Sequence, residues 1–127
     1  MTKRILLVDD DPNILEVLAG YLSGLEFKVH KASNGEEALH FLQKEKIDIL
    51  VTDVIMPIMN GIELTKIVNK EYPSIKVLAC SGGGESGKLV ASLALDQMLT
   101  QGANRALMKP FTEEEFVQKI LSLTGNK

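Results

Sequence analysis

The chain has 127 residues, of which 45% are hydrophobic and 24% are charged, a composition typical of a globular domain with one core. Its net charge of −3 offers no basic face to a phosphate backbone, so we expect no direct nucleic-acid binding. No apolar run reaches the ~18 residues of a membrane span, and the N-terminal segment turns acidic too soon for a signal peptide. We therefore expect no membrane association and a cytoplasmic location.

Strand-like and helix-like segments alternate along the chain, with no linker, repeat or low-complexity tract between them. An apolar run predicts a strand over residues 3–8. Asp11-Pro12 then provides an N-cap and a first-turn proline for a helix that ends near Ser23. A weaker strand is predicted over 27–32, followed by a helix over 36–44.

The second half of the chain continues the alternation. The predicted elements are a strand over 47–52, a helix over 61–70 stopped by Tyr72-Pro73, a strand over 75–80, a helix over 86–101 stopped by Gly102, and a strand over 103–108. The last helix opens with Thr112-Glu113-Glu114-Glu115, which matches a capping box. This (βα)5 pattern predicts one α/β domain.

The helix over 86–101 is apolar on more than one side, since it carries Leu89, Val90, Leu93, Leu95, Met98 and Leu99. We expect core packing for these side chains, with a partner or dimer surface as the alternative. Elsewhere, Cys80 is expected to be a small buried hydrophobe, and His30 and His40 to be surface histidines.

Polar groups suited to phosphate chemistry follow the predicted strands at the point where each strand ends. Asp9-Asp10-Asp11 follow the first strand, Asp53 the third and Lys109-Pro110 the fifth, while Ser81 closes the fourth. The carboxyl ends of parallel strands lie along one edge of a sheet, which is where open α/β sheets bind ligands. We therefore expect these groups to share one pocket.

Carboxylates that converge need a cation or a shared proton. Two of them about 4 Å apart repel by roughly 4 kcal/mol at an effective dielectric constant of 20. Mg²⁺, or Mn²⁺, prefers hard oxygen ligands and is commonly held by one or two carboxylates together with phosphate oxygens. Asp10 and Asp53 are accordingly predicted metal ligands, whereas Asp11 alone is better explained as a helix cap.

These motifs together resemble the receiver domain of two-component response regulators, over essentially the whole chain. The matching residues are Asp9-Asp10, Asp53 with Met56-Pro57 and Gly61, Ser81, and Lys109-Pro110-Phe111. The resemblance implies a flavodoxin-like doubly wound fold, in which a five-stranded parallel sheet has the order 2-1-3-4-5 and carries five helices. It also implies a signalling domain of a phosphorelay, which assists only its own phosphorylation and dephosphorylation and is not an enzyme.

The resemblance implies that a sensor histidine kinase or a phosphotransfer protein donates a phosphoryl group to Asp53, giving an aspartyl phosphate. Asp10, the carboxylate of Asp53 and the backbone carbonyl of Ile55 would bind Mg²⁺ directly, and Asp9 would act through water.

The remaining implied roles concern the phosphate itself. Lys109 would pair with it and Ser81 would donate a hydrogen bond to it, so Asp53, Ser81 and Lys109 form the implied catalytic set. Ser81 would also pull the loop after the fourth strand inward, which makes it a switch residue.

Three features of the chain are individual to it within the family pattern. The second switch position, usually tyrosine or phenylalanine, is Ala106, and a methyl group cannot gate a pocket by changing rotamer. We therefore expect signalling through the loop and helix on the Ser81 side. Ile55 and Gly83 occupy variable positions near the phosphate, and neither side chain can hold water, so dephosphorylation is expected to be slow and to speed up in Ile55→Asn.

The segment between Ser81 and Lys109 is also longer than is usual for the family, and the extra residues are expected in 82–88 and the helix that follows. Adjacent glycines in this segment are expected to give a loop without one preferred conformation.

Two other functions compete with this interpretation. The segment from Gly82 to Lys88 has the spacing of a P-loop for nucleotide binding, but Leu89 stands where that motif needs Ser or Thr. A haloacid-dehalogenase-like phosphatase would use Asp9 as its nucleophile, but Asn13 stands where Thr or Val is expected and the order of the other motifs is wrong.

The domain organisation follows from the same pattern. Residues 1–127 are expected to form a single receiver domain without an output domain in this chain. Such a domain acts on a separate downstream protein target, as a monomer or a weak phosphorylation-dependent dimer. A fragment of a longer protein is the open alternative.

Overall fold

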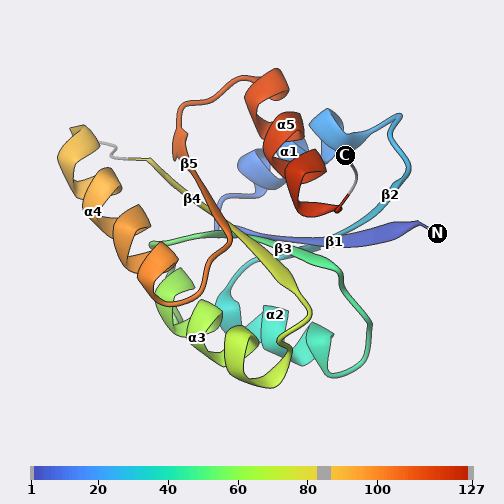
Figure 1. Cartoon of the computed structure of the whole chain (residues 1–127), viewed down its shortest axis with the longest axis horizontal. Coiled ribbons are helices and arrows are strands. Elements are labelled where there is room, and N and C mark those ends of the chain that lie inside the picture. Colours follow the sequence, from blue (N-terminus) through green and yellow to red (C-terminus); the bar gives the residue numbers. More distant parts are fainter. Residues whose placement is uncertain (1, 83–86, 126–127) are drawn as a thin grey trace.

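The computed structural model describes residues 2–82 and 87–125, and strands and helices alternate throughout this part of the chain (Figure 1). The elements are β1 (Lys3–Val8), α1 (Pro12–Leu22), β2 (Phe27–Ala32), α2 (Gly35–Leu42), β3 (Ile49–Asp53), α3 (Gly61–Glu71), β4 (Lys76–Gly82), α4 (Gly87–Thr100), β5 (Arg105–Lys109) and α5 (Glu113–Leu123). None of the helices in the described ranges is long and apolar enough to cross a membrane.

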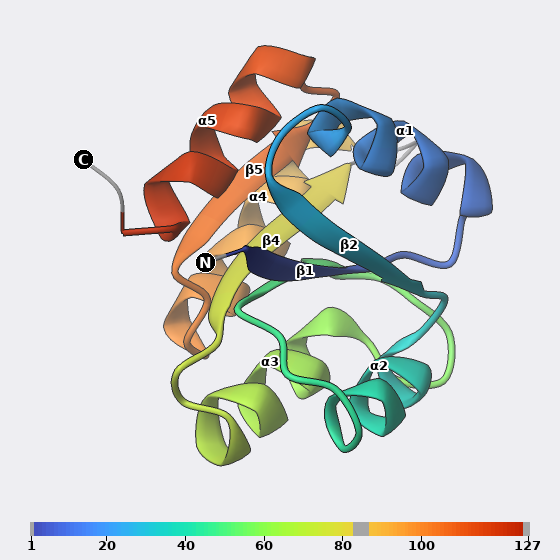
Figure 2. The same ribbon diagram turned by 90° about the vertical axis from the view of Figure 1, so that its right-hand side faces the viewer.

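The strands form one parallel sheet in the order β2-β1-β3-β4-β5, which confirms the predicted doubly wound topology. The alternation of side chains along β1 shows how the sheet builds two cores. Ile5 and Leu7 pack in the core beneath α1 and α5, whereas Leu6 and Val8 pack in the core beneath α2, α3 and α4. Figure 2 shows these two helix layers on opposite faces of the sheet.

Helix caps determine several boundaries locally. The side chain of Asp11 accepts a hydrogen bond from the backbone N–H of Asn13, as predicted for an N-cap ahead of Pro12. The capping box at Thr112 and Glu115 is also confirmed. The side chain of Asn34 caps α2 by accepting a hydrogen bond from the backbone N–H of Glu37, so this helix begins at Gly35. It ends at Leu42, and both ends therefore lie earlier in the chain than predicted.

The last two strands lie further along the chain than predicted. β4 continues past Cys80 to Gly82, and β5 runs from Arg105 to Lys109. The reason is their mutual pairing, since Ser81 lies opposite Met108 and Gly82 opposite Lys109. Ser81 and Lys109 are therefore held inside the sheet and not in the loops that follow it.

Helix α4 does not pack as predicted. Leu95 and Met98 are buried, but Leu89, Val90, Leu93 and Leu99 are exposed, so the expectation of core packing is wrong for these side chains. The physical reason is that α4 packs on β4 and β5 at one edge of the sheet (Figure 1). The side of α4 that faces away from the sheet is therefore open to solvent at these leucine and valine residues. The predicted helix start at Ser86 and the rest of the glycine-rich segment 83–86 lie outside the described residues.

Candidate functional site

The parallel sheet brings the predicted strand-end groups together at one edge. Asp9 follows β1, Asp53 ends β3, Ser81 and Gly82 end β4, and Lys109 ends β5. Because β1, β3, β4 and β5 are neighbours in the sheet, residues far apart in sequence share this edge. The expectation of a common pocket is confirmed in part, because Asp53, Ser81 and Lys109 line one pocket and Asp9 and Asp10 lie beside Asp53, whereas Asp11 belongs to neither group.

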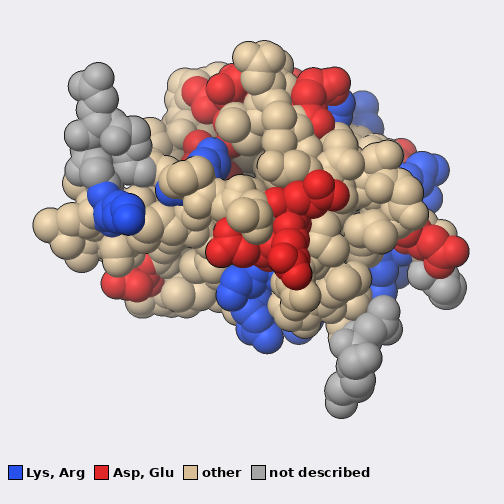
Figure 3. All heavy atoms as spheres, turned by 90° about the horizontal axis from the view of Figure 1, so that it is seen from above, with Lys and Arg blue, Asp and Glu red and all other residues tan. Residues whose placement is uncertain are grey.

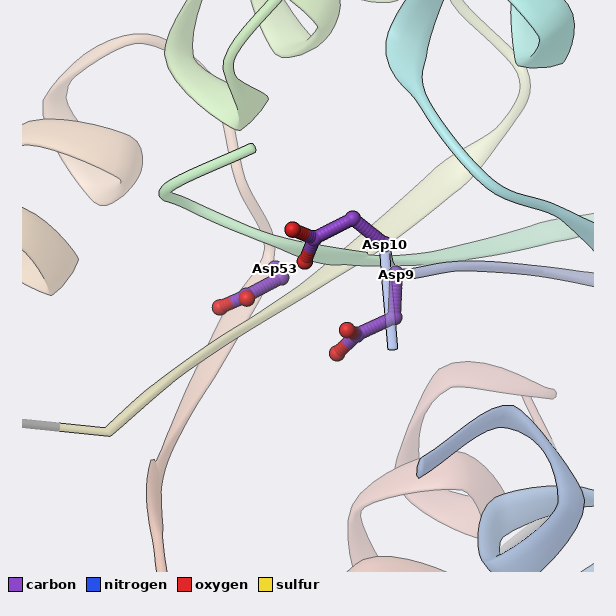
Figure 4. A group of neighbouring side chains, drawn as sticks. All are labelled: Asp9, Asp10 and Asp53. Atoms are coloured by element: carbon purple, nitrogen blue, oxygen red, sulfur yellow. The ribbon is translucent and has the colours of Figure 1, made fainter. Parts of the chain in front are cut away.

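Three carboxylates form the acidic part of the site. Oxygen atoms of Asp9, Asp10 and Asp53 all lie within 4.8 Å of one another. Figure 4 shows their carboxylates directed to the same side of the sheet edge. A compact set of hard oxygen donors fits Mg²⁺ or Mn²⁺. On the face of the molecule seen in Figure 3, acidic side chains gather near the middle.

The three carboxylates have different partners. Asp9 is buried, with one oxygen accepting from the Nζ of Lys109 at 3.0 Å and the other from the backbone N–H of Asp11 at 2.9 Å. Asp10 is exposed, and Asp53 is partly buried. Protein donors therefore already occupy both oxygens of Asp9, whereas the exposed Asp10 is better placed for direct contact with an ion.

Lys109 is the cationic part of the site. Its Nζ lies 3.0 Å from Asp9 and 3.7 Å from Asp53. Burial lowers the pKa of Lys109, but the carboxylates of Asp53 and Asp9 outweigh this and raise it above its ordinary value. Gly82 allows this placement, because a Cβ at that position would come within 2.9 Å of the Cβ of Lys109.

Asp53 has an unusual protonation equilibrium. Burial raises its pKa to about 6, and the neighbouring charges of Asp9 and Asp10 act in the same direction. Lys109 and the N–H of Val54, which donates to the Oδ1 of Asp53 at 2.9 Å, oppose the rise. In the metal-free site, ionisation of Asp53 is therefore less favourable than in water. A cation bound there would offset the repulsion among the carboxylates of Asp9, Asp10 and Asp53.

A pocket of about 500 Å³ opens at this edge, and we call it the strand-end pocket. Its polar end is formed by Asp53, Ser81 and Lys109. Ser81 is itself buried at the end of β4. The rest of the wall is largely apolar and comes mainly from α1 and the segment after β5, namely Ile14, Val17, Leu18, Tyr21, Pro110 and Phe111, together with Ile55 and Gly82.

The apolar wall was not predicted from the sequence. The apolar residues of α1 have helical spacing, which indicates a core-facing side. Leu18 is indeed buried, but Val17 is 47% exposed and borders the pocket. The one sequence feature that could have indicated this is the position of Val17 at the edge of the apolar face of α1, directly before Leu18.

The loop between β3 and α3 carries two exposed isoleucines. Ile55 borders the strand-end pocket and is 64% exposed. Ile58 is 72% exposed and has a φ of +73°, which is rare for a β-branched residue and was not foreseen. The assignment of the Ile55 carbonyl to the metal stays a prediction, and Gly83 lies outside the described residues.

The atypical switch position is part of the sheet. Ala106 lies in β5 opposite Ala79 and packs, partly buried, against the core beneath α2, α3 and α4. The methyl group of an alanine cannot change rotamer when a ligand binds, so Ala106 cannot act as a rotameric switch.

The residues set aside in the sequence behave largely as expected. Cys80 is buried, and burial raises the pKa of its thiol to about 12, which agrees with an inert small hydrophobe. His40 is exposed, as predicted. His30 is only partly exposed, and its Nε2 is buried beside the ring of Phe41 without a hydrogen-bond partner among residues 2–82 and 87–125, so the prediction of a surface histidine is only partly right.

Comparison with known proteins gives a consistent result. A family model described as the response regulator receiver domain matches residues 5–121. The chemotaxis protein CheY of Thermotoga maritima is 31% identical over 121 residues, which cover 94% of this chain and 96% of that protein. The alkaline phosphatase synthesis transcriptional regulatory protein PhoP of Bacillus subtilis is 32% identical over 123 residues, covering 97% of this chain and 49% of that protein.

The chain thus spans about half the length of PhoP and nearly all of CheY. Among solved structures, the chemotaxis response regulator CheY4 of Vibrio cholerae aligns with a TM-score of 0.82 and 26% identity, over 97% of this chain and 99% of that chain. These matches support neither the P-loop nor the phosphatase alternative.

Proposed function

The chain belongs to the response regulator receiver domain family, and from this premise we propose that Asp53 is the residue that accepts a phosphoryl group. The observation that carries the proposal is the position of the Asp53 carboxylate, which lies between an acidic cluster and Lys109 and borders an open pocket. No other described carboxylate combines these surroundings with a place in the pocket wall.

The chemistry requires a nucleophile, charge neutralisation and positioning. An oxygen of Asp53 attacks phosphorus, and the bond from phosphorus to the leaving group of the donor breaks. Lys109 pairs with the transferred group, and the hydroxyl of Ser81 donates a hydrogen bond to it. Because the pKa of Asp53 is about 6, its carboxylate is ionised and nucleophilic at neutral pH.

Receiver domains of this family use Mg²⁺, and the residues present here fit that ion. Asp10, the carboxylate of Asp53 and the backbone carbonyl of Ile55 would hold it directly, with Asp9 acting through water. When bound, it would neutralise the charge that accumulates on the oxygens of the transferred group. The occupied oxygens of Asp9 support this division of roles.

We propose that a sensor histidine kinase or phosphotransfer protein supplies the phosphoryl group, and that the phosphorylated surface is read by a separate protein target. The chain would act as one receiver domain in the cytoplasm, as a monomer or a weak phosphorylation-dependent dimer. Its chemistry would be confined to its own phosphorylation and dephosphorylation, so it would not be an enzyme.

Mass spectrometry of the chain treated with acetyl phosphate and Mg²⁺ tests the function. We expect the mass to increase by one phosphoryl group, with the label on Asp53. The label should be lost in Asp53→Asn and in EDTA. Asp11→Asn, which alters the neighbouring helix cap outside the acidic cluster, should keep it. A label on Asp9 would instead support the phosphatase alternative.

A further inference from the structure

The strand-end pocket has two chemically different parts. Asp53, Ser81 and Lys109 form a polar end where a phosphoryl group would be held. Continuous with it is an apolar wall that includes Val17 and Tyr21 of α1 and Phe111 after β5. The volume of about 500 Å³ lies in the range of small-molecule sites.

The apolar wall is a built part of the fold. Phe111 stacks on Phe116 with 5.7 Å between ring centroids, and Tyr21 packs on the same ring at 6.0 Å. Phe116 is completely buried in the core beneath α1 and α5. The aromatic side chains of the wall are therefore anchored by the core, and the wall can bind a ligand with little loss of side-chain entropy.

A molecule that fits both parts has a phosphate at one end and an apolar group at the other. In phosphoryl transfer the leaving group is still attached when phosphorus reaches Asp53, so it must lie in the space that adjoins the polar end. We propose that the apolar wall is a subsite for the leaving group, and that this chain accepts phosphoryl groups from acyl phosphates with an apolar chain faster than from acetyl phosphate. This inference rests on the proposed role of Asp53.

The reaction balances without a further reactant. A bond forms between an oxygen of Asp53 and phosphorus, and the bond between phosphorus and the acyl oxygen breaks. The electron pair of the broken bond stays with that oxygen, which leaves as a carboxylate. No redox change occurs and no proton is required, because the attacking carboxylate is ionised at neutral pH.

A homologous series of donors measures the effect of the chain alone. Acetyl, propionyl and butyryl phosphate release straight-chain carboxylates of similar basicity, so their intrinsic reactivities are similar. Each methylene buried against the wall should raise the second-order rate constant for labelling Asp53 by up to about fourfold, equivalent to ~0.8 kcal/mol. The readout is the initial rate of phosphorylation in Mg²⁺, followed by intact-protein mass spectrometry.

Two exposed apolar positions provide the test variant and its matched control. Val17→Asn makes the wall polar at a side chain that is 47% exposed, and it should lower the ratio of the butyryl rate to the acetyl rate towards one. Leu121→Asn makes the same kind of change on α5, outside the pocket, at a side chain that is 43% exposed. The control should keep the ratio of the unmodified chain.

The outcomes separate the inference from the function on which it rests. Labelling of Asp53 at equal rates by all three donors would overturn the subsite and leave the phosphoacceptor role intact. A rate that rises with chain length equally in Val17→Asn and the unmodified chain would also overturn the assignment to this wall. No labelling of Asp53 by any donor would overturn both proposals.

Discussion

At the scale of the residue, the ionised carboxylate of Asp53 is held at a cost to stability. Its pKa of about 6 lies above the ordinary value of 3.8, chiefly because of burial. A raised pKa in the folded state means that the folded protein binds this proton more tightly than the unfolded chain does. The stabilisation that comes from protonating Asp53 is therefore complete below pH 3.8 and is lost as the pH rises through about 6.

Replacing this carboxylate should stabilise the metal-free protein. In EDTA at pH 8, Asp53→Asn is expected to raise the free energy of unfolding by about 2 kcal/mol, and the gain should be small at pH 4. Urea unfolding at both pH values measures it. Asp96→Asn, the same change at an exposed position on α4, serves as the control and should have little effect. An equal gain at both pH values would show that ionisation of Asp53 is not the cause.

Ile58 stores strain in the neighbouring loop. With a φ of +73° it occupies the left-handed region, which costs a residue with a Cβ about 1 to 2 kcal/mol. Its side chain is 72% exposed, so packing within this chain does little to compensate. Strain of this kind is concentrated at functional sites.

Asparagine tolerates this conformation better, so Ile58→Asn should raise the free energy of unfolding by about 1 kcal/mol. Ile55→Asn is the matched control, because Ile55 is also exposed and is not among the described residues with positive φ. Thermal or urea unfolding of the two variants provides the comparison. Equal stability of both would mean that the loop carries no strain at Ile58.

At the scale of the element, the start of α3 connects helix formation to the site. Asn60 and Glu63 form a capping box, and the N–H of Gly61 donates to the carbonyl of Val54 at 2.7 Å. Gly61 lies so close to the chain that a Cβ there would overlap the backbone oxygen of Asp53. The glycine therefore lets α3 begin directly against Asp53, the proposed phosphoacceptor.

Gly61→Ala should force the backbone at Asp53 to move, which we expect to cost about 2 kcal/mol of stability and to slow phosphorylation. Gly20→Ala is a matched change in α1, where a Cβ would meet nothing within 4 Å. That variant should gain about 0.5 to 1 kcal/mol from helix propensity. Unfolding measurements and the rate of labelling by acetyl phosphate test both, and a neutral Gly61→Ala would contradict the close approach.

At the scale of the whole molecule, we expect an unusual route by which phosphorylation would change the surface. Ala106 cannot act as an aromatic switch, while Ser81 lies at the end of β4, which leads toward α4. α4 presents Leu89, Val90 and Leu93 to solvent. A shift of this helix would change an apolar surface without any rotamer change in β5.

We therefore expect a phosphate mimic such as beryllofluoride to alter the segment from Ser81 to Gln101 and to leave β5 around Ala106 in place. Backbone amide NMR shifts, or structures with and without the mimic, measure this change. Asp53→Asn should show no response to the mimic. Unchanged signals over residues 81–101 would rule out this route.

Features that depend on neighbours along the chain could be predicted from the order of residues alone. The caps at Asp11 and Thr112, the alternation of strands and helices, and the strand-end positions of Asp53 and Lys109 are of this kind. Topology then brings strand ends to one edge of the sheet by a general rule, so the site could be predicted without coordinates.

Features that depend on distance and burial became visible only in the folded structure. It showed that Lys109 lies closer to Asp9 than to Asp53, that the pKa of Asp53 is raised, and that Val17 borders a pocket. It also showed that apolar side chains on the outer side of α4 are exposed. Their exposure depends on how far neighbouring elements extend over the helix, which a local sequence pattern does not indicate. Electrostatic and packing energies act through space between residues remote in sequence, and a local pattern of residues does not contain those distances.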